Sequence, residues 1–263
     1  MVADPILLGR FPATLDLTPD GLYAFVVNFN LHGEHVPSSI SVVYTPSLTE
    51  VTQTETCTMP HGSRMHPNGI HLYSACMMDD ELVEIDTRTF EVARRMDVAL
   101  HAGAASSGQT APGPMCSPTW AASAPSGKRI FVACNKGNVI LQVNHETWEV
   151  ERSVETPAGP YNLAITPDER LLIATLKQSG AVLFLDLDTF ETLGVEETTT
   201  TVTHGVEVSP DSRYAFVSSE GVGAEPGTVD IFDLRTLRRV ASVDVAQQAG
   251  GIAFWKMEGG TQP

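Results

Sequence analysis

Short apolar runs separated by a recurrent turn form the dominant pattern of this chain. Each run ends on a turn built around proline, and a second β-rich run such as 24–27 or 130–133 follows it. Neighbouring turn prolines are roughly 40 to 60 residues apart, which is the period of four-stranded blades. The pattern therefore predicts an all-β repeat protein. The turn prolines are Pro19, Pro67, Pro125, Pro167 and Pro210.

A second shared turn divides each repeat further. It opens with Asp or Asn and carries Thr near its end, and a shorter version lies at 44–49. Asp and Asn favour turns because their side chains bond to backbone groups two residues on. Each repeat is thus expected to run strand, proline turn, strand, loop, strand, Asp–Thr turn, strand. The turn occurs at 85–90, 143–148, 185–190 and 232–237, and the expected blades cover 11–57, 59–100, 114–156, 158–199 and 202–245.

Both ends of the chain carry an apolar segment outside these five repeats. Residues 6–10 resemble a last strand and residues 251–255 a first strand. We expect segments 5–10 and 248–256 to close a single domain, 1–263, as an incomplete sixth blade, because closing a ring protects strand edges. A truncated seven-bladed propeller is the alternative.

The repeat resembles the YVTN family of β-propellers. Residues 25–28 and 209–211 match the family's strand and turn most closely, and the resemblance covers residues 5 to 255. It implies a β-propeller with five full four-stranded blades plus the incomplete sixth. It says little about function, because propellers carry many unrelated activities.

The balance of acidic and basic residues limits the classes of partner that we expect. The chain has 32 acidic against 16 basic residues, a formal charge of −16. Such a balance disfavours nucleic acids and anionic membranes, since phosphate binding needs Lys and Arg. No apolar run approaches a membrane span, so we expect a soluble protein without membrane insertion. The expected partner is a small-molecule substrate or ligand, and the oligomeric state stays open.

Localisation stays open as well. Residues 1–12 lack the basic and apolar regions of a signal peptide. The protein is therefore cytoplasmic, or periplasmic or extracellular if a leader has been removed.

Candidate site residues occupy one equivalent position of the repeats, six residues before the turn proline. His61 and His204 hold it in the second and fifth repeats, and each is followed by glycine. The same position is Tyr161 in the fourth repeat, Thr119 or Pro118 in the third, and Gly250 or Gly251 near the C-terminus. Neutral imidazole is the commonest side-chain metal ligand. We expect the two histidines to share a divalent ion at the channel mouth, unless each only bonds neighbouring backbone.

The loops after the second strands add further candidates on the same face. His35 and Glu220 are expected as additional metal ligands, His32 or His35 as a catalytic base, and Tyr161 and Lys136 as electrophilic helpers. The other histidines, at 66, 71, 101 and 145, are expected to be structural or exposed.

These residues favour a metal-assisted hydrolase of small esters, lactones or phosphoesters, with a zinc-, calcium- or manganese-class ion that activates water. Two alternatives stay open: a non-catalytic propeller that binds a protein or small ligand, and a copper- or redox-associated periplasmic protein. Copper is less favoured, because the nearby methionines suit packing equally well. The sequence shows no nucleophile elbow, Walker loop or GxGxxG motif.

Four cysteines follow the repeat. Cys57 and Cys116 precede first strands, and Cys76 and Cys134 end second strands. They form either two disulfides, Cys57–Cys76 and Cys116–Cys134, each within one blade, or buried free thiols. Disulfides would indicate an oxidising compartment.

Overall fold

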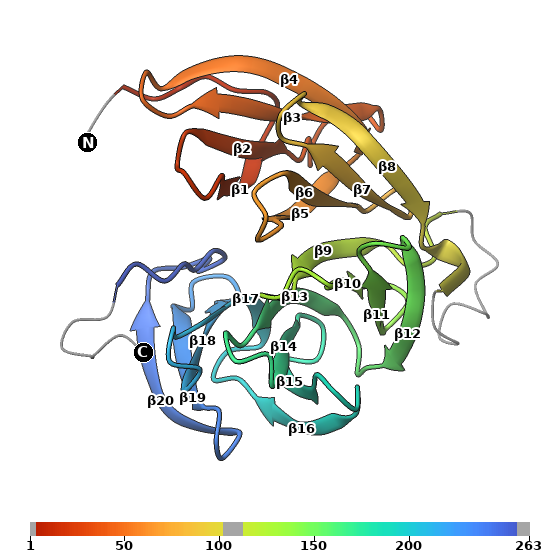
Figure 1. Cartoon of the computed structure of the whole chain (residues 1–263). Coiled ribbons are helices and arrows are strands. Elements are labelled where there is room, and N and C mark those ends of the chain that lie inside the picture. The colour runs from red at the N-terminus through yellow and green to blue at the C-terminus, as the bar shows by residue number, and fades with distance from the viewer. Residues whose placement is uncertain (1–3, 102–112, 257–263) are drawn as a thin grey trace. The chain divides into compact units, whose positions relative to one another are not determined.

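The computed structural model describes residues 4–101 and 113–256 (Figure 1). These residues form five four-stranded antiparallel sheets, in which strands follow one another in chain order, and contain no α-helix. The all-β prediction and the five four-stranded sheets are confirmed. No helix in this described part is long and apolar enough to cross a membrane.

The chain divides into two compact units, Met1–Ser153 and Val154–Pro263, and the last residues of β12 fall just past the boundary. Unit 1 contains three sheets. The first is β1 (Pro12–Leu17), β2 (Tyr23–Asn28), β3 (Pro37–Tyr44) and β4 (Thr49–Thr58). The second is β5 (Pro60–Met65), β6 (His71–Cys76), β7 (Glu81–Asp86) and β8 (Glu91–Asp97), followed by a 3-10 turn, η1 (Ala99–His101). The third is β9 (Pro118–Ser123), β10 (Arg129–Cys134), β11 (Val139–Asn144) and β12 (Glu149–Glu155).

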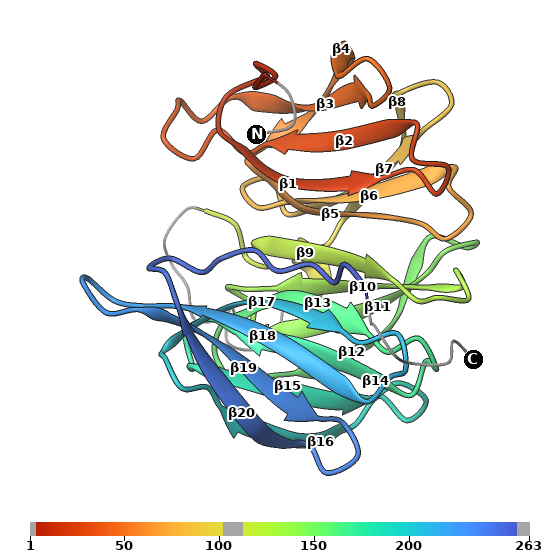
Figure 2. The same cartoon turned by 90° about the vertical axis from the view of Figure 1, so that its left-hand side faces the viewer.

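Unit 2 contains two sheets, whose strands are seen from a second side in Figure 2. One is β13 (Pro160–Ile165), β14 (Leu171–Leu176), β15 (Ala181–Asp186) and β16 (Thr192–Glu197). The other is β17 (Val202–Val208), β18 (Tyr214–Glu220), β19 (Gly227–Asp233) and β20 (Arg238–Val245).

Local side-chain chemistry explains both recurrent turns. In the proline turn, the Ser209 hydroxyl donates to the Asp211 carboxylate at 2.6 Å, and the Tyr214 N–H donates to the Ser209 hydroxyl. In the Asp–Thr turn, the Asp186 carboxylate accepts the backbone N–H of residues 188 and 189. Phe190 closes this turn with a left-handed φ of 62°. The turn chemistry expected from the sequence is thus present.

Within unit 1, the first strands β1, β5 and β9 lie side by side, and the sheets pack face to face. Thr14 donates to the His61 carbonyl at 2.7 Å, and the Met65 N–H donates to Asp16 at 2.7 Å, which ties β1 to β5. Apolar side chains fill both gaps between sheets, with Phe25, Ile40 and Leu72 in the first, for example. Burial of this surface is the main stabilising term.

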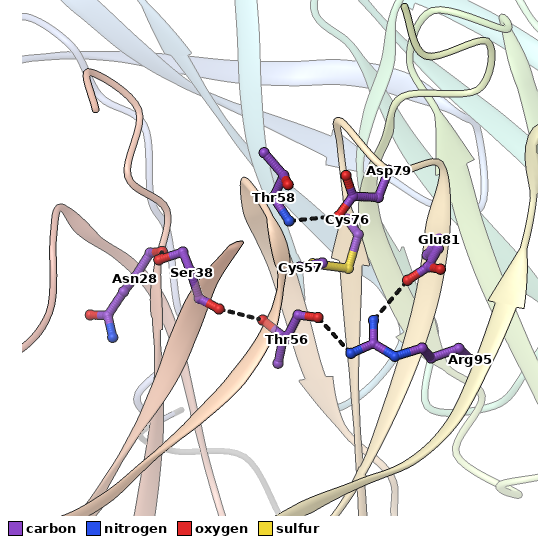
Figure 3. Close-up of a disulfide and its surroundings, with 9 residues drawn as sticks. All are labelled: Asn28, Ser38, Thr56, Cys57, Thr58, Cys76, Asp79, Glu81 and Arg95. Carbon is purple, nitrogen blue, oxygen red and sulfur yellow. Dashed lines mark hydrogen bonds and ion pairs between the residues drawn. A yellow bond between two sulfur atoms is a disulfide. The ribbon is translucent and has the colours of Figure 1, made fainter. Parts of the chain in front are cut away.

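A disulfide joins two sheets rather than closing one blade (Figure 3). Cys57 lies on β4 of the first sheet, and Cys76 ends β6 of the second. The prediction that this pair lies within one blade is wrong, because β4 is ten residues long and includes Cys57. Beside the disulfide, Arg95 of β8 donates to the Thr56 carbonyl at 2.6 Å, and the Thr58 N–H donates to Asp79 at 2.7 Å.

The second disulfide, Cys116–Cys134, connects the segment before β9 to the end of β10 and stays within the third sheet. The described cysteines include no free thiol. Of the two alternatives, disulfides and free thiols, the structure therefore contains disulfides.

In unit 2, β13 and β17 lie side by side, and a core that includes Phe184 and Phe232 fills the space between the two sheets. Residues 6–10 in unit 1 and 251–255 in unit 2, expected as strands, do not have strand conformation. Segment 248–256 nevertheless packs along β17 and β18, since the Ser218 hydroxyl donates to the Gly250 carbonyl at 2.9 Å. That the two terminal segments close a sixth blade stays a prediction.

Candidate functional site

Four side chains of unit 2 form a polar cluster, which we call the His204 cluster: Tyr161, Lys177, His204 and Glu220. Tyr161 and His204 hold the same repeat position on the neighbouring strands β13 and β17, so their rings meet edge to face with centroids 4.6 Å apart. Lys177 directly follows β14, and Glu220 ends β18. First strands thus supply the two rings, and second strands supply the two charges.

Two side-chain nitrogen atoms lie close to one carboxylate oxygen. His204 Nε2 lies 3.4 Å from Glu220 Oε1, and Lys177 Nζ lies 3.6 Å from the same oxygen. Lys177 Nζ also sits 4.4 Å from the centre of the Tyr161 ring. The side chains of His204, Lys177 and Glu220 are between 19% and 29% exposed, so the cluster is accessible to small solutes.

The backbone fixes the tautomer of His204. Its Nδ1 lies 2.9 Å from the Gly250 carbonyl oxygen. A carbonyl only accepts hydrogen bonds, so Nδ1 carries the proton. In the neutral ring, Nε2 then has a lone pair, and it lies beside the Glu220 carboxylate.

Burial sets the protonation states. It lowers the pKa of His204 to about 4, the Lys177 ammonium lowers it further, and the bond to Gly250 opposes the shift. Burial also lowers the pKa of Lys177, against the attraction of Glu220, and raises the pKa of Tyr161. At neutral pH the cluster therefore presents a neutral imidazole and a protonated phenol.

This arrangement has the chemistry of a two-residue metal chelate. An imidazole lone pair and a carboxylate oxygen face each other, and their repulsion is relieved by a cation between them. In tetrahedral zinc sites with bonds of about 2.0–2.2 Å, two ligand atoms lie roughly 3.4 Å apart. The separation of His204 Nε2 and Glu220 Oε1 fits that distance.

His61, in unit 1, repeats the backbone arrangement of His204. Its Nδ1 lies 2.8 Å from the Thr119 carbonyl of β9, the equivalent position of the next repeat. His61 is 5% exposed, and its ring packs against Phe29 and Trp120, with centroids 4.7 and 6.0 Å away. Each predicted histidine therefore bonds neighbouring backbone, as the structural alternative expects. The Gly250 carbonyl accepts from His204 as the Thr119 carbonyl of β9 accepts from His61, so segment 248–256 lies where the first strand of a following repeat would lie. That His61 and His204 share an ion stays a prediction.

The remaining predicted residues lie in unit 1. His32 is exposed, and its ring meets Phe11 edge to face at 5.5 Å. His35 is exposed, while Lys136 is half-buried and donates its backbone N–H to the Cys116 carbonyl. Of the expected site residues, the structure thus brings together Tyr161, His204 and Glu220.

Sequence reasoning missed Lys177. It directly follows a second strand, as Asn135 and Lys136 do in the third repeat. The loop position that selected Lys136, just after a second strand, would have selected Lys177 as well.

No protein-family model matches the chain, and no curated protein matches it in sequence. Among solved structures, the chain is similar to a chain described as Kuenenia stuttgartiensis hydrazine synthase, with a TM-score of 0.71 and 21% identity. The match covers 88% of this chain and 65% of that one, so this chain spans less than two thirds of the length of its structural neighbour. The likeness supports a propeller-like all-β fold and carries no conclusion about activity.

Proposed function

We propose that this chain is a metal-dependent hydrolase of small esters, lactones or phosphoesters, with His204 and Glu220 as metal ligands. The observation that carries the proposal is the pairing of the unprotonated His204 Nε2 with Glu220 Oε1 at 3.4 Å. The lowered pKa of His204 supports it, because a neutral imidazole binds metal without releasing a proton.

The residues around this pair suit hydrolysis. A zinc-class ion held by His204 and Glu220 would supply a water of lowered pKa and would polarise the oxygen of the scissile group. Lys177, whose Nζ lies 3.6 Å from Glu220 Oε1, is placed to contact the developing negative charge of the substrate. Tyr161 keeps its proton at neutral pH, because burial raises its pKa, and so acts as a hydrogen-bond donor.

Calorimetric metal titration and activity assays test the proposal. Chelator-treated protein is titrated with zinc, manganese, calcium and copper, then assayed on chromogenic esters, lactones and phosphoesters with and without chelator. His204→Asn keeps an amide N–H for the Gly250 carbonyl but removes the ligand, and Glu220→Gln removes the carboxylate. We expect each variant to lose metal affinity by at least about 100-fold, together with hydrolysis.

Glu225→Gln is the matched control, because Glu225 lies exposed on the loop that follows β18. It should leave metal binding and activity unchanged. Equal metal affinity in His204→Asn, Glu220→Gln and the control would refute the ligand assignment. Parallel variants of His61, His35, His32 and Lys136 test the catalytic and ligand roles expected of them.

A second candidate function is a non-catalytic propeller that binds a small ligand or a protein. The ion pair between Lys177 and Glu220 favours it, since that carboxylate already has a cationic partner. Metal-independent ligand binding without hydrolysis would select this alternative. The two disulfides favour an oxidising compartment for either function.

A further inference from the structure

Three histidines gather in unit 1 where the second and third sheets meet. His66 follows β5, His71 begins β6 and His145 follows β11. The His66 and His145 rings stack with centroids 4.3 Å apart, and the His71 and His145 centroids are 5.2 Å apart. From the sequence, these residues were expected to be structural or exposed histidines, whereas the fold brings their rings together.

A buried carboxylate completes the group. Glu84 lies on β7, and its side chain is 2% exposed. His145 Nδ1 is 3.8 Å from Glu84 Oε2. One ligand atom each from His71, Glu84 and His145 lie within 4.8 Å of one another. Two imidazoles and a carboxylate are a common donor set for zinc and related divalent metals.

We propose that His71, Glu84 and His145 bind one divalent transition-metal ion of the zinc class. The ion ties β6 and β7 of the second sheet to the turn after β11 of the third. This site is separate from the His204 cluster and does not depend on the proposed hydrolase function.

The unprotonated state of the two imidazoles is compatible with metal binding. Burial lowers the pKa of His71, and burial together with the neighbouring His66 lowers the pKa of His145. Both rings are neutral at neutral pH, which is the form that ligates metal. Their half-buried position leaves the site accessible from solvent.

The surrounding contacts resemble the outer support of a metal site. Arg94 donates to both oxygens of Glu84 and also to the His145 carbonyl, so it holds two ligand-bearing segments in place. The Tyr73 hydroxyl lies 2.7 Å from His145 Nδ1, so it must turn away when this nitrogen binds the ion. A carboxylate ligand that is hydrogen-bonded as Glu84 is keeps its orientation before an ion binds.

Asn68 provides a further test of the site, because its side chain sets which nitrogen of His71 is free to bind an ion. Its Oδ1 accepts the Ile70 N–H at 2.8 Å, so its Nδ2 faces His71 Nδ1 at 3.1 Å and donates to it. A metal on Nε2 requires a proton on Nδ1, which Asn68 opposes. Asn68→Asp keeps an oxygen for Ile70 and gives Nδ1 a carboxylate acceptor. We therefore expect Asn68→Asp to tighten metal binding by about 10-fold or more.

Cobalt titration of the full oxidised chain tests the site. The His204→Asn background removes the other proposed ligand, so failure of the two proposals can be told apart. In this background we expect one Co²⁺ per chain, with visible d–d absorption, displaced by one Zn²⁺. His71→Ala and His145→Ala should each weaken binding by at least about 100-fold, while His101→Ala, an exposed matched control outside both proposed sites, should not change it.

Two results would overturn the proposal. One is a folded His204→Asn protein that binds no cobalt, and the other is binding that His71→Ala and His145→Ala leave unchanged. Asn68→Asp retains all three ligands, so it keeps the test decisive if an alanine variant fails to fold. An unchanged cobalt affinity in Asn68→Asp would contradict the assigned His71 ligand atom and overturn the proposal in this form.

Discussion

Acidification of the metal-free protein should destabilise unit 2 through His204. Burial lowers the pKa of this imidazole to about 4, whereas an unfolded chain has a histidine pKa of about 6.5. Between these values the unfolded state binds a proton that the folded state does not, so stability falls as pH falls. Linkage over this window gives a loss of about 3 kcal/mol between pH 7 and pH 4.

The size of this loss depends on which charged groups lie beside His204. Glu220, 3.4 Å away, favours the imidazolium, but Lys177 shares the same carboxylate oxygen and opposes it. Because these two charges offset each other, burial decides the direction. Replacing Lys177 with Gln should therefore raise the pKa of His204.

Urea unfolding in chelator at pH 7, 6, 5 and 4, followed by far-UV circular dichroism, measures the effect. His204→Asn is the reference, since it retains a donor for Gly250 and does not titrate. The wild type should lose about 3 kcal/mol more than this variant over the range, and its His204 ring resonances should titrate near the shifted pKa. Parallel curves for the two proteins, or a His204 transition near pH 6.5, would show that burial does not hold His204 neutral in the folded protein.

Three further perturbations follow from the fold, each measured by urea unfolding. Replacing Cys57 and Cys76 by Ser should cost about 3 kcal/mol, because the bond closes a loop of about 20 residues; an unchanged midpoint would contradict the link between sheets. Phe184→Ala removes a fully buried ring and should cost about 3–5 kcal/mol, and a loss below 1 kcal/mol would argue against the core of unit 2. Asp211→Ala removes the acceptor of the Ser209 hydroxyl and should cost about 1 kcal/mol, whereas equal stability would show that the turn does not need it.

Local patterns made the strands and turns predictable from the sequence. The spacing of Ser209, Asp211 and the apolar run after them encodes a turn through bonds within a few residues. The same is true of the turn closed by Phe190. Such features need no knowledge of distant parts of the chain, which is why all five sheets could be expected.

Contacts between sheets were less predictable, because they depend on strand length and packing. The Cys57–Cys76 disulfide was expected within one blade, whereas Cys57 lies near the end of the long strand β4 and the bond reaches the neighbouring sheet. The grouping of His71, Glu84 and His145 arises from three different elements, and their sequence positions share no common offset. By contrast, Tyr161 and His204 share a repeat position, and that position is why both could be selected from the sequence as candidate residues of one site.

Anomalous diffraction from a zinc-soaked crystal shows whether His204 and Glu220 hold one ion. We expect a zinc peak roughly 2.0–2.2 Å from both His204 Nε2 and Glu220 Oε1, with Lys177 moved away from the carboxylate. Absence of zinc density there, with Lys177 still paired to Glu220, would contradict the claim that His204 and Glu220 form a metal site.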